Sequence, residues 1–160
     1  MRAAELADVA ALVAIETEVF AYEQLTRRAF RRYLGLPTAV CLVAQFDTSV
    51  VGYALATFRK AEGDARLESL AVTGRASGRG IGERLLQAVH DVAAARGARR
   101  VRLELRPDNM AALGLYLRLG YQVTGRRPGY YCDGADAVRM EMRLAAAVDD
   151  GASGSPAGPA

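Results

Sequence analysis

The strongest constraint on the fold of this chain is a cluster of glycines between an apolar segment and an amphipathic one. Residues 65–72 are almost continuously apolar, residues 73–82 contain four glycines, and residues 81–97 carry apolar side chains at helical spacing. A strand that leads through a glycine turn into a helix presents free backbone N–H groups, and the helix dipole favours an anion there. This order predicts a phosphate-binding turn in an α/β fold.

Two familiar nucleotide motifs do not fit this turn. A dinucleotide fingerprint needs glycine at position 83, where this chain has Glu83, and a P-loop needs a lysine that the region lacks. The nearby cations are Arg75, Arg79 and Arg84, whose guanidinium groups suit a diphosphate or a 3′-phosphate. The alternative is that the glycines only shape a tight connection between strand and helix.

Periodicity and turn residues predict the other elements of a single domain at residues 1–144. Asp8 and Thr26 are expected to cap the first two helices. The predicted helices are residues 8–21, 26–34, 81–97 and 107–119, and the predicted strands are residues 39–46, 50–60, 65–72, 100–106, 121–125 and 137–144. Residues 145–160 are rich in Ala, Gly, Ser and Pro and are expected to be a disordered tail.

Composition limits the possible functions. The net charge of +3 is too small to favour nucleic-acid binding, although the pI near 9.1 allows a basic patch for an anionic ligand. Cys41, Cys132 and the single histidine, His90, form neither a disulfide framework nor a metal-ligand cluster, so no metal is expected. His90 falls on the polar side of its predicted helix. Without a signal-peptide core or a membrane-spanning stretch, the sequence predicts a cytoplasmic protein with no membrane partner.

Several segments have a joint order and spacing that carry a family resemblance. They are Leu70-Ala71-Val72, residues 77–86, residues 103–109, residues 112–116 and Leu119-Gly120-Tyr121. Together they resemble the GNAT superfamily of acyl-CoA-dependent N-acyltransferases, and within it the ribosomal-protein alanine N-acetyltransferase branch. The resemblance covers residues 6–144. It implies an α/β GNAT fold, with a mixed central sheet of about six to seven strands that is splayed in its middle, and about four helices.

The resemblance also implies where acetyl-CoA binds. The pantetheine arm is expected in the gap between strands 65–72 and 100–106, with Asn109 and Tyr116 as further contacts. The expected backbone contacts are Leu70, Ala71 and Val72 for the arm, and Ser77, Gly78, Arg79, Gly80, Ile81 and Gly82 for the diphosphate. The family usually has Gln or Arg where this chain has Ser77, and an Asp-Pro-like pair at residues 73–74. These departures predict lower cofactor affinity or a more mobile loop.

Acetyl transfer from a thioester to an amine needs a neutral amine, a polarised carbonyl and a proton for the departing thiolate. Tyr116 resembles the family tyrosine that donates this proton; the alternative is a core aromatic. A strand N–H near Ala71 or Val72 is the candidate donor to the developing oxyanion.

Two glutamates are candidate bases. Glu104 resembles the base of relatives that acetylate protein N-termini, but Arg102 and Arg106 share its strand face, so a solvated ion-pair stripe is the alternative. Glu68 interrupts an apolar strand, and a glutamate in a matching place serves several small-amine acetyltransferases of the family. Both assignments stay open.

The acceptor is the least constrained part of the prediction. Tyr130 and Tyr131 lie where relatives that acetylate protein N-termini place tyrosines over the acceptor, which favours a protein or peptide α-amino group; ordinary loop aromatics are the alternative. A small-molecule amine, such as an antibiotic, and a non-catalytic acyl-CoA-binding module are the other hypotheses. A nucleic-acid platform is disfavoured because few aromatics accompany the arginines. A monomer and a homodimer are both compatible with the sequence.

Overall fold

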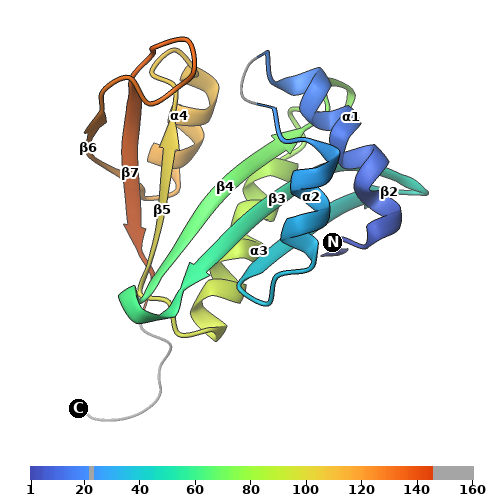
Figure 1. Ribbon diagram of the computed structural model, residues 1–160, viewed down its shortest axis with the longest axis horizontal. Coiled ribbons are helices and arrows are strands. Elements are labelled where there is room, and N and C mark those ends of the chain that lie inside the picture. Colours follow the sequence, from blue (N-terminus) through green and yellow to red (C-terminus); the bar gives the residue numbers. More distant parts are fainter. Residues whose placement is uncertain (22–23, 146–160) are drawn as a thin grey trace.

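The computed structural model describes residues 1–21 and 24–145, in which seven strands form one mixed sheet (Figure 1). The strand order is β1-β2-β3-β4-β5-β7-β6. The strands are β1 (Arg2–Ala3), β2 (Ala39–Phe46), β3 (Ser49–Arg59), β4 (Asp64–Val72), β5 (Arg100–Leu105), β6 (Gln122–Arg127) and β7 (Ala137–Arg143). The α-helices of these residues are α1 (Val9–Val19), α2 (Arg27–Leu34), α3 (Ile81–Ala95) and α4 (Met110–Arg118). The predicted fold class, strand number and helix number are confirmed.

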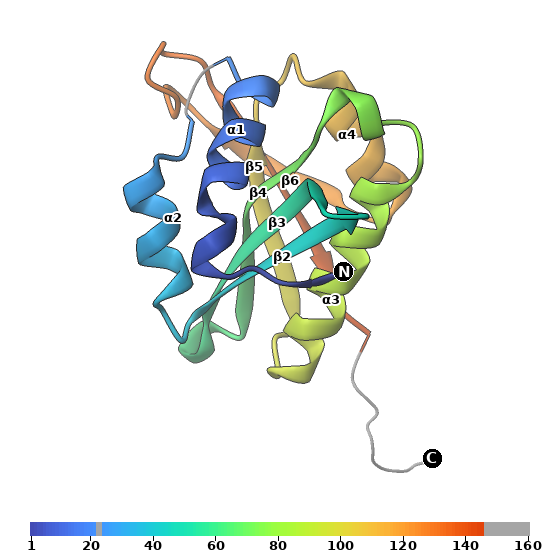
Figure 2. The same cartoon turned by 90° about the vertical axis from the view of Figure 1, so that its right-hand side faces the viewer.

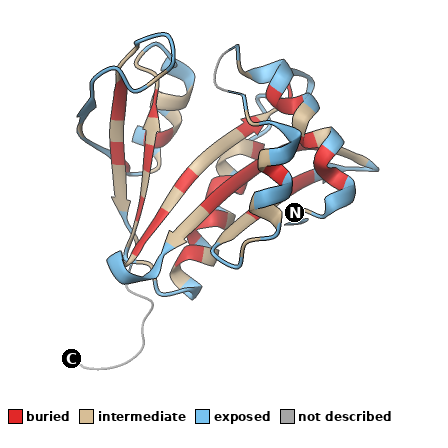
Figure 3. Cartoon of the chain, in the orientation of Figure 1, coloured by how far each residue is buried: buried red, intermediate tan, exposed pale blue. Residues whose placement is uncertain are grey.

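Two helical layers enclose the sheet. Helices α1 and α2 cover one face, and α3 and α4 cover the other (Figure 2). Each layer has its own apolar core: Leu12, Phe30 and Tyr53 belong to the first, and Leu85 and Leu103 to the second. Figure 3 shows many buried residues on the strands of the sheet. Residues 51–56 of β3 are all buried, as expected for a strand that is covered on both faces.

The sheet opens between β4 and β5. These strands are parallel, and their pairing joins only Asp64–Arg66 to residues 100–102, although β4 continues to Val72. From Leu67 onward the edge of β4 that faces β5 has no partner strand, and Figure 1 shows the two halves of the sheet diverging as a V. The splay implied by the family resemblance is therefore confirmed.

A β-bulge lies where β4 begins to diverge. Leu55 of β3 pairs with Ser69, but the next residue, Ala56, pairs with Leu67, so Glu68 is an extra residue without a partner across the ladder. Bulges bend a strand and increase its twist. The bulge thus turns β4 away from β5 and redirects the Glu68 side chain.

Local capping signals were predicted with mixed success. The Thr26 hydroxyl accepts a hydrogen bond from Ala29 N at 3.1 Å, as predicted for the start of α2. Asp8 occupies the N-cap position of α1, but its carboxylate accepts no bond from that helix. It binds the Arg2 guanidinium (2.8 and 2.9 Å) and the Glu5 amide (2.7 Å) instead.

Other features of the structure differ from the expectations, and some expectations lie outside the described residues. The placement of His90 on a polar surface was wrong, because the side chain is buried and its Nε2 lies 2.7 Å from the Tyr121 hydroxyl. Strand β1 was not predicted. The predicted tail lies outside the described residues apart from Ala145, and the domain boundary at 144 stays a prediction. Across residues 1–21 and 24–145, no helix is long and apolar enough to cross a bilayer.

Candidate functional site

A cavity of about 400 Å³ occupies the opening between β4 and β5. Its walls come from both strands, from α1 and α4, from the segment between α1 and α2, and from the loop between β6 and β7. The structure brings together these predicted site residues at the cavity: Glu68, Leu70, Glu104, Asn109, Tyr116, Tyr130 and Tyr131. Residues 77–82 of the glycine loop lie outside this lining.

The open edge of β4 presents backbone groups to the gap. Thr73 N donates to Val51 O of β3 at 2.8 Å, and polar groups of successive residues in an antiparallel strand point to alternate sides. The Ala71 amide therefore faces β3, whereas the Leu70 and Val72 amides face the gap. The two expected oxyanion donors were the amides of Ala71 and Val72. Because the Ala71 amide faces β3, Val72 stays the candidate.

The glycine loop is exposed at Ser77, Gly78, Arg79 and Gly80. Gly78 (φ 78°) and Gly80 (φ 74°) have left-handed conformations, which explains the residue type. The Ser77 amide is bonded to the carbonyl of residue 74 at 3.2 Å, but the amides of residues 78–80 donate to no acceptor in the described chain. The first-turn amides of α3 add further free donors. The loop thus combines exposure with several unused N–H groups.

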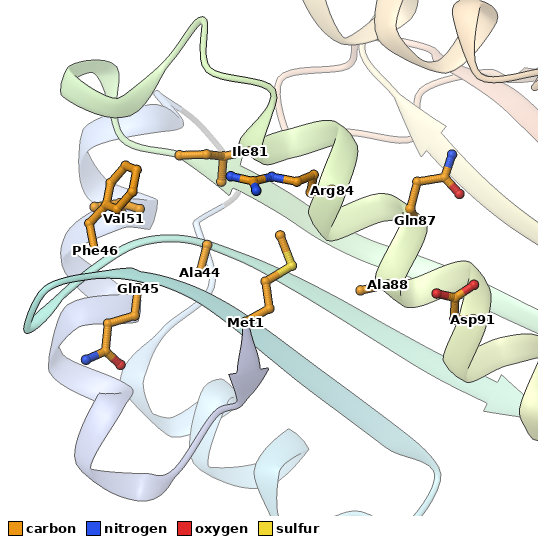
Figure 4. Close-up of a pocket in the computed structure, with 10 residues that line it drawn as sticks. All are labelled: Met1, Ala44, Gln45, Phe46, Val51, Ile81, Arg84, Gln87, Ala88 and Asp91. Carbon is orange, nitrogen blue, oxygen red and sulfur yellow. The ribbon is translucent and has the colours of Figure 1, made fainter.

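The guanidinium groups of two arginines near the loop lie on one side of it. Arg79 lies over the Phe46 ring, 5.4 Å from its centroid. Arg84 lines a separate cavity of about 500 Å³ between β2 and α3, in which Figure 4 shows it beside Ile81. In this structure both guanidinium groups lie on the β2 side of the loop rather than around it.

Tyr116 lies on α4 with only 7% of its surface exposed. Its ring packs edge-to-face on Tyr121, with 5.3 Å between centroids, and its side chain lines the cavity. Burial, and to a smaller extent the nearby Tyr131, raises the pKa of the Tyr116 phenol. The phenol therefore stays protonated at neutral pH and can act as a proton donor.

Glu104 is half-buried as a residue, but only 4% of its side chain is exposed. Its Oε1 lies 2.7 Å from Arg66 Nη2, and its Oε2 lies 3.9 Å from Arg139 Nε. The contact with Arg66 lacks hydrogen-bond alignment, so Oε1 has no hydrogen-bond donor among the described residues. Glu104 thus lines the cavity as a carboxylate held beside Arg66.

The ion-pair partners of Glu104 are Arg66 and Arg139 and not the strand neighbours considered for it. Arg102 pairs with Asp64 at 3.0 Å, and Arg106 pairs with Asp133 at 2.6 Å. Arg102 and Arg106 therefore pair with other carboxylates. The nearest partner of Glu104 is Arg66, which comes from β4 across the gap between β4 and β5.

Glu68 points into the same cavity from the bulge, with 21% of its side chain exposed. Its Oε2 accepts a hydrogen bond from the Thr57 hydroxyl at 2.7 Å and lies 3.5 Å from Arg66 Nε. Arg66 also donates to the Tyr130 hydroxyl at 2.6 Å. It thereby contacts both candidate bases and a candidate acceptor-binding tyrosine. The sequence analysis did not single it out, although an arginine in an apolar strand two positions before Glu68 was a usable signal.

The loop between β6 and β7 closes one side of the cavity. Tyr130 and Tyr131 pack edge-to-face, with centroids 4.9 Å apart and rings at 90°. Arg106 lies 5.0 Å from the centroid of the Tyr131 ring and donates to both carboxylate oxygens of Asp133, at 2.6 and 3.2 Å. These bonds from Arg106 lower the pKa of Asp133. The loop is thereby fastened to the end of β5.

Glu16 of α1 is a buried carboxylate that the sequence analysis missed. With 1% exposure, it accepts hydrogen bonds from the Tyr53 hydroxyl, the Ser69 hydroxyl (3.1 Å) and Leu25 N (2.7 Å). It lies four residues after Leu12, on the apolar side of α1, which was the available signal. Glu16 joins the segment between α1 and α2 to β4, so it connects two walls of the cavity.

Asn109 begins α4. Its Oδ1 accepts a hydrogen bond from Ala112 N at 3.2 Å, which is an N-cap bond. The residue lines the cavity, so its side-chain amide group lies near the predicted path of a cofactor.

Comparisons with known proteins agree on one family. A family model described as "Acetyltransferase (GNAT) family" matches residues 8–121, which is more than half of the chain. The N-alpha-acetyltransferase RimI of Mycobacterium tuberculosis is 40% identical over 115 residues, covering 70% of this chain and 71% of that protein.

Solved structures show the same architecture. The ribosomal-protein-S18-alanine N-acetyltransferase from Escherichia coli superposes with a TM-score of 0.80 at 25% identity, covering 94% of this chain and 96% of that one. Ard1 from Thermoplasma volcanium gives a TM-score of 0.82 at 25% identity, covering 90% of this chain and 96% of that one.

Proposed function

Because the chain belongs to the GNAT family of acetyltransferases, we propose that it moves the acetyl group of acetyl-CoA to the α-amino group of a protein or peptide N-terminus. Family members use acetyl-CoA, and relatives are named for ribosomal-protein alanine and N-terminal α-amino acetylation. The observation that carries the proposal is the splay itself. The open edge of β4 runs from the exposed glycine loop to a cavity that holds Tyr116 and Glu104.

The residues present fit acetyl-CoA. Free amides at residues 78–80 and at the start of α3 suit a diphosphate. The Leu70 and Val72 backbone groups suit the amide-bearing pantetheine arm, with the neighbouring Ala71 completing this strand segment and Asn109 on the opposite wall. Acetyl-CoA supplies an acetyl thioester. In our proposal Val72 N–H donates to the thioester oxygen and stabilises the charge that develops there.

Proton transfer falls to two residues in this proposal. Tyr116 donates its phenolic proton to the departing thiolate, because its side chain lines the cavity from α4. Glu104, whose carboxylate lines the cavity beside Arg66, accepts the proton of the attacking amine, directly or through water. Glu68, whose Oε2 is occupied by the Thr57 hydroxyl, is the rival base. An α-amino group has a reference pKa of roughly 7.7–8.0 and needs less assistance than a lysine near 10.4.

The test is turnover of peptide libraries, measured as release of the free thiol of CoA together with the mass of the acetylated peptide. We expect Tyr116→Phe to lower kcat by about 10²–10⁴-fold, the usual contribution of a positioned acid. Glu104→Gln should lower kcat more than Glu68→Gln; the reverse order would make Glu68 the base. If peptides are not acetylated while small amines are, the assignment of the acceptor is refuted. Binding of acetyl-CoA without turnover of any amine would refute the enzyme activity.

A further inference from the structure

Helix α2 carries a strongly basic face that the proposed chemistry does not use. Four of its eight residues are arginines, and all four are exposed: Arg27, Arg28, Arg31 and Arg32. Figure 3 marks exposed positions along this helix. Their guanidinium groups make no ion pair or hydrogen bond with any residue that the structure describes; the recorded contact is that of Arg32 with the Tyr33 ring, at 4.8 Å. The arginines around the cavity, by contrast, are paired with carboxylates.

Arg31 and Arg32, in the last turn, suit the helix dipole, but the rest of this arrangement works against the helix. Arg27 and Arg31, like Arg28 and Arg32, are like charges at i,i+4 spacing and repel each other. Arg27 and Arg28 lie in the first turn, at the positive end of the helix dipole, and no acidic residue is present in that turn. A local conflict that no contact with the described residues 1–21 and 24–145 compensates points to a role in binding.

The basic face begins next to the acceptor side of the cavity. Leu25 lines the cavity, and Thr26 caps α2 directly after it. Helix α2 lies beside α1 on the same face of the sheet (Figure 2). From Arg27 to Arg32 the helix rises by about 7.5 Å, which two to three residues of an extended peptide span. A polypeptide that leaves the cavity over this wall meets the arginines within a few residues.

We propose that the basic face of α2 binds an acidic segment of the acceptor polypeptide, a few residues after the amine that is acetylated. This inference rests on the proposed function and adds a substrate class to it: N-termini followed by aspartate or glutamate. Guanidinium groups bind carboxylates with paired, charge-assisted hydrogen bonds, and exposed arginines give up little hydration to do so.

The same observations disfavour a nucleic acid as the partner. Phe30 is fully buried and Tyr33 is half-buried under Arg32, so α2 offers no exposed aromatic platform for bases. Four cations on one short helix match a few carboxylates better than the extended phosphate backbone of a duplex, and the net charge of the chain is only +3.

The experiment compares three peptides that share their first three residues and carry glutamate, glutamine or arginine at the following positions. Arginine is used in place of lysine so that the α-amino group is the single acceptor. We expect kcat/KM to fall from the acidic to the neutral to the basic peptide, mainly through KM. The preference should disappear at about 0.5 M salt, where exposed charges are screened.

The matched variants change the net charge equally. Arg27→Gln/Arg31→Gln should lower kcat/KM for the acidic peptide about fivefold, the effect of losing two exposed ion pairs, and leave the neutral peptide within about twofold. The control is Arg99→Gln/Arg143→Gln, two exposed arginines outside the cavity lining. It should leave all three peptides unaffected. Glutamine keeps the helix propensity of arginine, so the α2 variant keeps its fold; the control positions are exposed and lie outside the helices, before β5 and at the end of β7.

The outcomes separate the two proposals. Equal turnover of the three peptides, or equal loss with the control variant, overturns the inference and leaves the proposed function intact. Binding of single-stranded RNA that the α2 variant abolishes and that blocks the acidic peptide would make nucleic acid the partner and also overturn it. Failure to acetylate any peptide refutes the proposed function and removes the premise of the inference.

Discussion

Replacing Glu16 by glutamine tests whether one buried carboxylate sets the shape of the acceptor cavity. Glu16 Oε2 holds Leu25 N at 2.7 Å, and Oε1 accepts from the hydroxyls of Tyr53 and Ser69. Leu25 and Glu68, the neighbour of Ser69, both line the cavity. The substitution keeps the shape of the side chain and removes the charge to which all three donors point.

The structure sets the magnitude. The backbone amide of Leu25 can only donate a hydrogen bond, so it requires the one oxygen that glutamine keeps. The glutamine NH₂ group then faces the hydroxyls of Tyr53 and Ser69. Those hydroxyls lie 2.8 Å apart and keep the hydrogen bond between them. The loss is therefore about one to two charge-assisted hydrogen bonds of about 1.5–3 kcal/mol each. Burying a carboxylate without a nearby cation has a desolvation cost. The neutral glutamine avoids that cost, which offsets part of this loss. We expect Glu16→Gln to lower the free energy of unfolding by about 2 kcal/mol.

The assay is a double-mutant cycle with Tyr53→Phe, measured by urea unfolding. Because the two residues share one hydrogen bond, the double variant should lose at least about 1 kcal/mol less than the sum of the single variants. In steady-state kinetics, Glu16→Gln should raise KM for the peptide and leave KM for acetyl-CoA within about twofold. Additivity within about 0.5 kcal/mol would refute the shared bond. Leu12 lies in the same core but outside the cavity. An equal rise of KM for the peptide in Leu12→Val would mean that Glu16 only stabilises the fold.

Two more predictions concern the cofactor loop and the histidine. Gly80→Ala places a side chain at φ 74° in open space, so it should cost about 1–2 kcal/mol of stability and raise KM for acetyl-CoA without raising KM for the peptide; an unchanged KM for acetyl-CoA would separate the loop from the diphosphate. Burial lowers the pKa of His90, so the unfolded chain binds the proton more readily and stability falls as the pH drops below about 6.5. The unfolding free energy of His90→Gln, measured between about pH 5 and 7, should lose this slope, since the sequence has no other histidine.

The elements that local signals encode were predictable. The glycine loop, the hairpin turn and the Thr26 cap depend on neighbours in sequence; the turn was predicted at residues 47–49, and the structure shortens it to 47–48 because Ser49 already pairs with Phe46. Strand β1 was not predictable, because a strand of two residues shows no periodicity. It is defined by its pairing with β2. The buried position of His90 depends on Tyr121, 31 residues away, which no helical pattern reveals.

The residues of the cavity were predictable, but their partners were not. Glu104, Tyr116 and Tyr130 were identified by resemblance, and all line the cavity. The expected partners of Glu104 were its strand neighbours, whereas the observed ones are Arg66, at 2.7 Å, and Arg139, at 3.9 Å. Parallel pairing sets Arg66 opposite residue 102, next to Glu104 on the same face, and this register depends on where β4 and β5 part. A sequence motif names the residues of a site, but the register of the sheet decides which charges meet.

The splay also explains why the ligand-binding edge lies in the middle of the sheet. The apolar core on the α3 and α4 side contains residues of both halves, such as Leu67 and Leu103, so the halves remain joined on that face. On the other face β4 turns away at the bulge, and the Leu70 and Val72 amides lose the strand that would have bonded them. Backbone groups beside an apolar core need a partner, because an unpaired one costs about as much as a lost hydrogen bond. A ligand arm with its own amide groups supplies that partner, so the feature that weakens the sheet is the one that favours binding.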